Sequence, residues 1–106
     1  MSKAHEFRSE CPLAGALDVL GDKWTLLIIR DLARNKCTYG ELEKLEENIT
    51  TNILADRLKF LVSEGVFEQR PYQERPVRYE YHLSNKGKDL FPWFLTLLQW
   101  GDKWCD

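Results

Sequence analysis

The stretch from Thr38 to Leu83 constrains the fold more than any other part of this chain. It contains two helical patterns joined by a short turn, followed by two β-type segments that flank an arginine- and proline-containing tip. This order predicts a winged helix-turn-helix, an α+β fold that is mainly helical with a small β-hairpin. Such a shape commonly places one helix in the DNA major groove while the hairpin reaches the neighbouring backbone or minor groove.

Capping signals mark the two helices of this stretch. Thr38 and Glu41 have the spacing of a capping box at the start of the first, short helix. Thr50 or Thr51 can cap the second helix, and Gly65 supplies its C-terminal stop. Apolar residues at helical spacing predict the buried stripe of the second helix: Leu54, Leu58, Leu61 and Val62.

The hairpin is predicted from two segments rich in Val, Phe and Tyr. Residues 66–72 and 77–83 are the expected strands, and residues 73–76 are the expected tip. Pro71 and Pro76 fit an edge hairpin and not a central strand, because proline cannot donate a ladder hydrogen bond.

Two helices are expected before this unit. The first is expected over residues 12–20. Cys11 occupies its N-cap position, and Pro12 occupies the first helical position, which proline favours. Residues 23–33 form the second helical pattern, and Asp22 can cap it.

The expected C-terminal helix, residues 85–104, carries too many large apolar side chains for one buried stripe, and Pro92 would kink or restart it. Burial against a second copy would cover this surface, so we expect a homodimer. The alternative is that the first helix covers it within one chain. The expected dimer interface draws on both terminal helices and comprises Leu13, Leu17, Phe91, Phe94, Leu95, Leu98 and Trp100.

The 106 residues correspond to a single domain. Within it we expect an N-terminal arm over residues 1–10, the helix-turn-helix over 38–65, the wing over 66–83 and a dimerisation helix over 84–106. The sequence shows neither an apolar run long enough to span a membrane nor a signal-peptide pattern, so we expect a cytoplasmic protein without membrane contact.

Positive and negative side chains are concentrated in separate segments of the sequence. The net charge of −2 argues against a general polyanion binder. Residues 69–88 carry five basic and two acidic side chains, a local charge of 5 − 2 = +3. Residues 40–48 carry one basic and four acidic side chains, a local charge of 1 − 4 = −3. The simpler interpretation is that both are solvated faces.

Several segments together resemble the HxlR-type branch of winged-helix regulators, which is related to the MarR group. They are Cys11-Pro12, residues 17–24 (LDVLGDKW), Arg57-Leu58-Lys59 with Leu61, Glu64-Gly65-Val66, and residues 76–84 (PVRYEYHLS) with Gly87. Each is weak alone, but their order and spacing are specific. The resemblance implies a homodimeric transcription factor that binds operator DNA, usually as a repressor. The chain departs from the family pattern at Asp22, where glycine is more frequent and only the helix cap should change, and at Glu74, which could weaken DNA contact.

The second helix of the helix-turn-helix is the expected recognition helix. Its early outward residues, Thr50, Thr51, Asn52 and Ala55, are expected at base edges. Asn52 could read adenine through paired hydrogen bonds, and threonine methyl groups can contact thymine. The alternative is that Thr50 and Thr51 only cap the helix.

Basic side chains are expected on the DNA backbone. Arg57 and Lys59 are predicted phosphate contacts, which position a protein without reading sequence. The alternative for Arg57 is an internal ion pair with a carboxylate such as Glu41 or Glu64.

Two wing arginines complete the predicted DNA-binding residues. Arg75 at the tip is expected in the minor groove, and Arg78 is expected to brace the wing or hold a phosphate. The alternative is a solvated wing.

Cys11 is the candidate sensor residue. A thiolate at a helix N-terminus is stabilised by free backbone N–H groups, and His5 and Arg8 lie nearby in the sequence. The resemblance implies a cysteine that senses electrophiles or oxidants at this position, whereas the alternative is a small buried apolar residue. The other two cysteines are Cys37, in a turn, and Cys105, near the end of the chain.

Other functions find less support. The two histidines, His5 and His82, lie in no nucleophile or metal-binding motif, and the three cysteines lack the close spacing of a zinc site. We therefore expect no catalysis, no metal and no cofactor. The main alternative is a winged-helix protein–protein interaction module without specific DNA binding.

Aromatic residues leave room for a small effector. Trp24, Trp93, Phe94 and Trp100 could line a pocket for an aromatic ligand between the dimer helices and the winged domain, although such residues more often belong to a core.

Overall fold

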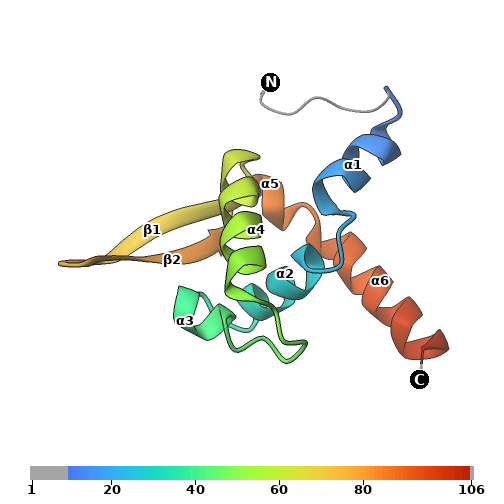
Figure 1. The fold of residues 1–106 in the computed structure, drawn as a ribbon. Coiled ribbons are helices and arrows are strands. Elements are labelled where there is room, and N and C mark those ends of the chain that lie inside the picture. The colour runs from blue at the N-terminus through green and yellow to red at the C-terminus, as the bar shows by residue number, and fades with distance from the viewer. Residues whose placement is uncertain (1–9, 106) are drawn as a thin grey trace.

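The computed structural model of the chain describes residues 10–105. These residues form six helices and one hairpin. Their arrangement confirms the predicted winged helix-turn-helix with helices added at both ends (Figure 1). In chain order the elements are α1 (Pro12–Leu20), α2 (Thr25–Ala33), α3 (Tyr39–Leu42), α4 (Thr51–Ser63), β1 (Phe67–Glu74), β2 (Val77–Leu83), α5 (Asn85–Lys88) and α6 (Phe91–Trp104). The expected N-terminal arm lies outside the described residues except for Glu10.

The capping signals of the helix-turn-helix act as predicted. The Thr38 hydroxyl accepts a hydrogen bond from Glu41 N (3.2 Å), and the Glu41 carboxylate accepts one from Thr38 N (3.1 Å). Thr50, and not Thr51, caps α4 by accepting from Ile53 N at 3.2 Å. Gly65 follows α4 with a φ of +77°, the left-handed conformation that favours glycine at a helix end.

The core lies where α2, α3 and α4 meet the first residue of the wing. Burial of such apolar side chains contributes roughly 1.5–3 kcal/mol each to folding. The core is built mainly from aliphatic residues, with one aromatic ring at the start of β1. Its most deeply buried members are Ile28, Ile29, Leu42, Leu54, Leu58, Leu61 and Phe67. The predicted stripe of α4 is buried at three positions, and Val62 is half-buried against this cluster.

The second helix begins two residues later than predicted, at Thr25 instead of Lys23. The carboxylate of Asp22 accepts hydrogen bonds from Trp24 N and Thr25 N, both at 3.0 Å. Asp22 therefore serves the first turn as expected, but it does so from a short bend that precedes the helix.

The hairpin is longer than predicted and has a tighter tip. β1 extends to Glu74, so only Arg75 and Pro76 connect the two antiparallel strands. The register shifts between Pro71 and Gln73, which leaves Tyr72 as an extra residue on β1. A bulge beside a proline accommodates the missing N–H of the ladder, and the sequence pattern did not reveal it.

The C-terminal segment is interrupted, and Pro92 lies in the first turn of the restarted helix α6. None of the residues of α6 is buried. In Figure 1, α6 extends away from the core on the side opposite to the wing. Within residues 10–105, none of the helices has the length and apolar character needed to cross a membrane.

Candidate nucleic-acid interface

One face of α4 is exposed and polar. Thr51, Asn52, Ala55 and Lys59 are all exposed, whereas the opposite stripe of the helix is buried in the core. Tyr39 Oη donates a hydrogen bond to the carbonyl oxygen of Thr51 at 3.2 Å, which fastens α3 to the beginning of α4. The N-terminal half of α4 therefore presents three predicted base-contacting side chains from a backbone that is held in place.

Thr50 has a structural role as well, since its hydroxyl caps the helix. Its side chain thus fulfils the capping alternative, while the residue remains exposed. A contact between Thr50 and DNA stays a prediction.

Arg57 differs from its neighbours on α4. Its Nη2 lies 3.5 Å from the Asp22 carboxylate and 3.5 Å from the Val19 carbonyl oxygen, and the guanidinium lies 4.6 Å from the centre of the Phe60 ring. Its Nε is buried without a hydrogen-bond partner among the described residues. The internal ion pair is therefore the arrangement observed. A contact between Arg57 and a phosphate stays a prediction.

The partner of this ion pair corrects two expectations. The carboxylate is that of Asp22, and not that of Glu41 or Glu64. Asp22 was expected to affect only the helix cap, but it also connects the bend before α2 to the middle of α4.

The tip of the wing carries free positive charge. Arg75 and Arg78 are exposed, and neither has an ion pair with another residue between positions 10 and 105. Further down the wing, Arg70 is paired with Glu68 at 2.8 Å. Glu74 is exposed beside Arg75 and is the acidic residue of the tip.

The acidic segment between α3 and α4 is partly neutralised. Arg30 of α2 forms two hydrogen bonds of 2.9 Å with the Glu47 carboxylate, and Arg34 lies 3.7 Å from Glu46. These ion pairs reduce the repulsion that the segment would exert on a nearby phosphate backbone.

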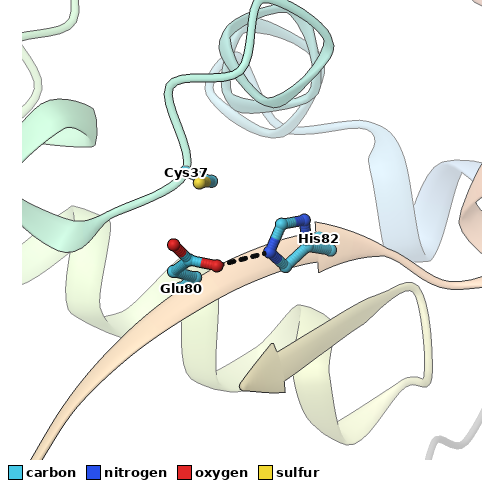
Figure 2. Close-up of side chains that lie close together, drawn as sticks. All are labelled: Cys37, Glu80 and His82. Carbon is cyan, nitrogen blue, oxygen red and sulfur yellow. Dashed lines mark hydrogen bonds and ion pairs between the residues drawn. The ribbon is translucent and has the colours of Figure 1, made fainter. Parts of the chain in front are cut away.

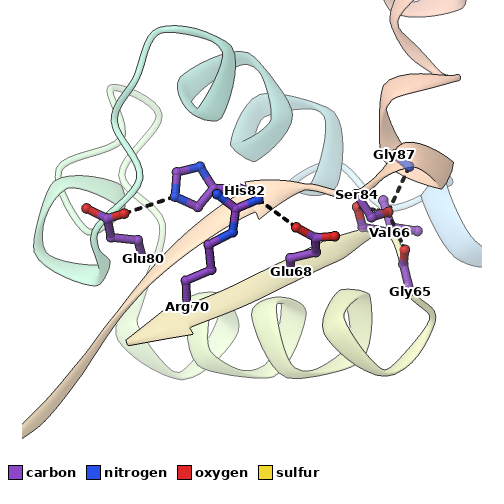
Figure 3. A network of polar contacts seen from close by, with 8 residues as sticks. All are labelled: Gly65, Val66, Glu68, Arg70, Glu80, His82, Ser84 and Gly87. Carbon is purple, nitrogen blue, oxygen red and sulfur yellow. Dashed lines mark hydrogen bonds and ion pairs between the residues drawn. The ribbon is translucent and has the colours of Figure 1, made fainter. Parts of the chain in front are cut away.

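The base of the wing is fixed to the end of α4 by a small polar network (Figure 3). Ser84 Oγ donates to the carbonyl oxygens of Gly65 and Val66 and accepts from Gly87 N at 3.1 Å. A Cβ atom on Gly87 would lie 2.3 Å from the Val66 carbonyl oxygen, so only glycine fits there. The network holds the orientation of the wing relative to α4.

Cys11 is exposed at the N-terminus of α1. Backbone N–H groups of Ala14 and Leu13 stabilise its thiolate and lower the pKa of Cys11 below its ordinary value. Burial raises the pKa of Cys37, and the charges of Glu80 and Glu41 add to this effect. His5 and Arg8, which were considered as further influences on Cys11, lie outside the described residues.

The predicted dimer residues are largely exposed in the single chain. Leu13, Leu98 and Trp100 are 67%, 57% and 60% exposed, and Leu17 and Leu95 are also exposed. The rings of Phe91 and Phe94 stack with their centres 5.6 Å apart and are half-buried. α1 contributes only Leu20 to the buried residues, so it does not cover α6 within one chain.

The four aromatic residues of the expected effector pocket have different environments. Trp24 and Phe94 are partly buried against the core, whereas Trp93 and Trp100 are exposed.

A group of side chains that the sequence did not predict lies where β2 passes the turn before α3 (Figure 2). Cys37, Glu80 and His82 place one potential ligand atom each within 4.8 Å of one another. The alternation of Glu80 and His82 along one strand was a signal for two of these three residues. Cys37 comes from a distant segment, and the spacing of the cysteines alone could not reveal it.

The chain is similar to known proteins in both sequence and structure. A family model described as HxlR-like helix-turn-helix matches residues 19–106. An uncharacterised HTH-type transcriptional regulator of Mycobacterium tuberculosis is 38% identical over 101 residues, which are 95% of this chain and 63% of the relative. The chain therefore spans less than two thirds of that relative.

Two regulators of known structure are also similar. The oxidised form of the redox regulator HypR has a TM-score of 0.82 at 29% identity, with 91% of this chain and 99% of that chain covered. The reduced form of the transcriptional regulator YodB from Bacillus subtilis has a TM-score of 0.74 at 31% identity, with 92% and 97% covered. Diamide-treated YodB has a TM-score of 0.71 at 32% identity, with 91% and 96% covered.

Proposed function

Because the chain belongs to the HxlR-like helix-turn-helix family, we propose that it is a transcriptional regulator that binds operator DNA as a homodimer and acts as a repressor. The observation that carries this proposal is the pairing of an exposed polar face on α4 with an unpaired arginine tip on the wing. A helix of this kind fits the major groove, and the arginines fit the adjacent minor groove or backbone.

The proposed contacts fall into two classes. Thr50, Thr51, Asn52 and Ala55 would meet base edges and supply sequence preference. Lys59 and the wing arginines would meet phosphates or the minor groove and supply most of the salt-dependent affinity. Arg57 is left out, since its guanidinium is bound to Asp22.

The proposed dimer joins the exposed apolar faces of α1 and α6. A symmetric pair would bury Leu13, Leu17, Leu98 and Trp100, which a monomer leaves in water. The domain division proposed here keeps residues 38–65 as the helix-turn-helix, 66–83 as the wing and 84–106 as the dimerisation segment.

Cys11 is the proposed sensor of electrophiles or oxidants. Its exposure and its lowered pKa favour the reactive thiolate form. It sits at the start of α1, a proposed dimer helix, so its modification would move that helix and misalign two recognition helices that must match half-sites ~34 Å apart. The names of HypR and YodB as redox or diamide-treated regulators are consistent with this role.

The test is a fluorescence anisotropy titration of the protein against a labelled duplex from the region upstream of its own gene. A scrambled duplex serves as competitor, and each titration is run at several salt concentrations, with reductant and with diamide. Sequence-selective binding that weakens steeply with salt supports the proposal. Binding that is insensitive to salt and shows no duplex preference favours the protein–protein interaction module instead.

The sensor role has its own control. A Cys11→Ser variant should bind the same duplex but no longer respond to diamide. A variant that responds like the parent would rule out Cys11 as the sensor.

A further inference from the structure

Cys37, Glu80 and His82 meet at the base of the wing, on the face of β2 that passes the turn between α2 and α3 (Figure 2). The backbone fixes this meeting point. Tyr81 N donates a hydrogen bond of 2.8 Å to the Cys37 carbonyl oxygen, and Thr38 forms an isolated antiparallel bridge with Glu80. The three side chains are therefore brought together by main-chain contacts and not by chance side-chain positions.

We propose that Cys37, Glu80 and His82 form a binding site for a divalent transition-metal ion of the zinc type. Thiolate, imidazole and carboxylate are the donors that Zn²⁺ takes in four-coordinate sites, and a thiolate ligand disfavours Mg²⁺ and Ca²⁺. Three protein ligands leave the fourth position to water or to a small exogenous ligand.

The distances suit this coordination. Two atoms that each lie about 2 Å from a tetrahedral ion are roughly 3.3 Å apart. His82 Nε2 and Glu80 Oε1 are already 3.0 Å apart, and Cys37 Sγ lies within 4.8 Å of both ligand groups. All three residues are half-buried, so the site is partly shielded and still accessible to an ion from solvent.

The local charge also favours a cation. The Glu80 carboxylate belongs to the cluster, and the Glu41 carboxylate lies next to it and accepts a hydrogen bond from Cys37 N, so the group carries negative charge. A bound divalent ion would compensate this negative charge. On binding, the S–H bond of Cys37 breaks, a sulfur–metal bond forms and the proton passes to solvent, while Glu80 binds as a carboxylate and His82 as neutral imidazole.

Glu41 supports the site from outside. Its carboxylate accepts hydrogen bonds from Cys37 N and Thr38 N, both at 3.1 Å, and thereby orients the cysteine backbone. The metal would join β2 to the turn that precedes α3 and so stiffen the wing relative to the helix-turn-helix. Any effect of the metal on DNA affinity depends on the proposed function, whereas metal binding itself does not.

Co²⁺ is the appropriate probe, because a tetrahedral cobalt–thiolate centre has a near-ultraviolet charge-transfer band and intense visible bands. The titration uses the full chain and a Cys11→Ser/Cys105→Ser variant, in which Cys37 is the remaining cysteine. We expect both proteins to bind one equivalent with this spectrum, and Zn²⁺ to abolish it by displacing cobalt. A band that is absent, or that disappears in the Cys11→Ser/Cys105→Ser variant, would overturn the proposal.

Further substitutions in that variant test the individual ligands. Cys37→Ser should abolish the charge-transfer band, and Glu80→Gln or His82→Gln should weaken Co²⁺ binding about tenfold or more. Glu74→Gln changes another wing carboxylate, outside the cluster, and should leave Co²⁺ affinity unchanged. A band retained in Cys37→Ser would overturn the proposal.

A second measurement does not depend on the folding of a ligand variant. In the Cys11→Ser/Cys105→Ser protein, Zn²⁺ should slow the alkylation of Cys37 by iodoacetamide, since a metal-bound thiolate is protected. An alkylation rate that Zn²⁺ does not change would contradict the site.

Discussion

At the scale of single residues, the three cysteines of this chain have distinct environments. Cys11 is exposed at a helix N-terminus, where the N–H groups of Ala14 and Leu13 lower its pKa. Cys37 is half-buried, and burial raises its pKa. The thiolate is the reactive form, so these two opposite shifts should separate the reactivity of the two residues.

We therefore expect iodoacetamide to modify Cys11 at a lower pH than Cys37. At any pH between the two pKa values Cys11 is largely thiolate, whereas Cys37 is still largely protonated, so the rate for Cys37 rises only at higher pH. Peptide mass spectrometry of partially labelled protein over a pH series measures both rates. Faster modification of Cys37 at neutral pH would contradict the expected order.

Arg57 and Lys59 lie two positions apart on α4 but should behave differently. Arg57→Ala removes an ion pair to Asp22 and a contact with the Phe60 ring, so we expect a loss of about 1–2 kcal/mol in the free energy of unfolding. Lys59→Ala removes an exposed charge and should change that free energy by less than about 0.5 kcal/mol. Urea denaturation of both variants checks this difference.

In DNA binding, the two variants should rank in the opposite order, with the larger effect from Lys59→Ala. Lys59→Ala should weaken binding evenly across sequences and reduce the salt slope by about 1, as expected for one lost phosphate contact. Arg57→Ala should leave the salt slope unchanged if the variant is folded. A slope reduced by Arg57→Ala and not by Lys59→Ala would reverse the assignment.

At the scale of elements, the wing combines opposite charges at its tip. Arg75 is exposed and has no ion pair within residues 10–105, while Glu74 is its exposed acidic neighbour. Arg75→Ala should cost about 1–3 kcal/mol of DNA-binding free energy if the arginine enters the minor groove. Glu74→Gln should increase the affinity, because it removes repulsion from the phosphates. Anisotropy titrations at low and high salt measure both, and a wing that only remains solvated would show neither effect.

Local signals predicted the elements, and long-range contacts caused the errors. The capping box at Thr38, the stop at Gly65 and the restart at Pro92 depend on neighbouring residues, so the sequence revealed them. The bulge at Tyr72 depends on pairing with the opposite strand, which a pattern along one strand does not encode. The late start of α2 is the exception, because it reflects a local bend that the Asp22 carboxylate stabilises through Trp24 N and Thr25 N.

The same distinction applies to the candidate sites. The exposed face of α4 follows from the periodicity of its buried stripe, so its outward residues were predictable. The ion pair between Asp22 and Arg57 and the cluster around Cys37 join segments far apart in the chain. Neither could be inferred from spacing, because the fold alone brings these residues together.

At the scale of the whole molecule, the winged helix-turn-helix accounts for the core, while α1 and α6 expose apolar surface beyond it. Leu98 is the central example, since it lies on α6 and is 57% exposed. A charge at this position costs little in an isolated chain but would be buried unpaired in a symmetric dimer, where it is costly. The oligomeric state should therefore depend on this single side chain.

We expect Leu98→Glu to yield a folded monomer with an unchanged helical circular dichroism spectrum, and we expect sedimentation velocity to show the loss of the dimer. Operator affinity should fall about 100-fold or more, because two half-sites are no longer bound by linked recognition helices. Gln99→Glu introduces the same charge at the neighbouring polar position of α6 and should remain a dimer with parental affinity. A Leu98→Glu protein that still sediments as a dimer would mean that the apolar face of α6 has another partner. A parental protein that is monomeric yet binds DNA selectively would show that operator recognition does not require dimerisation.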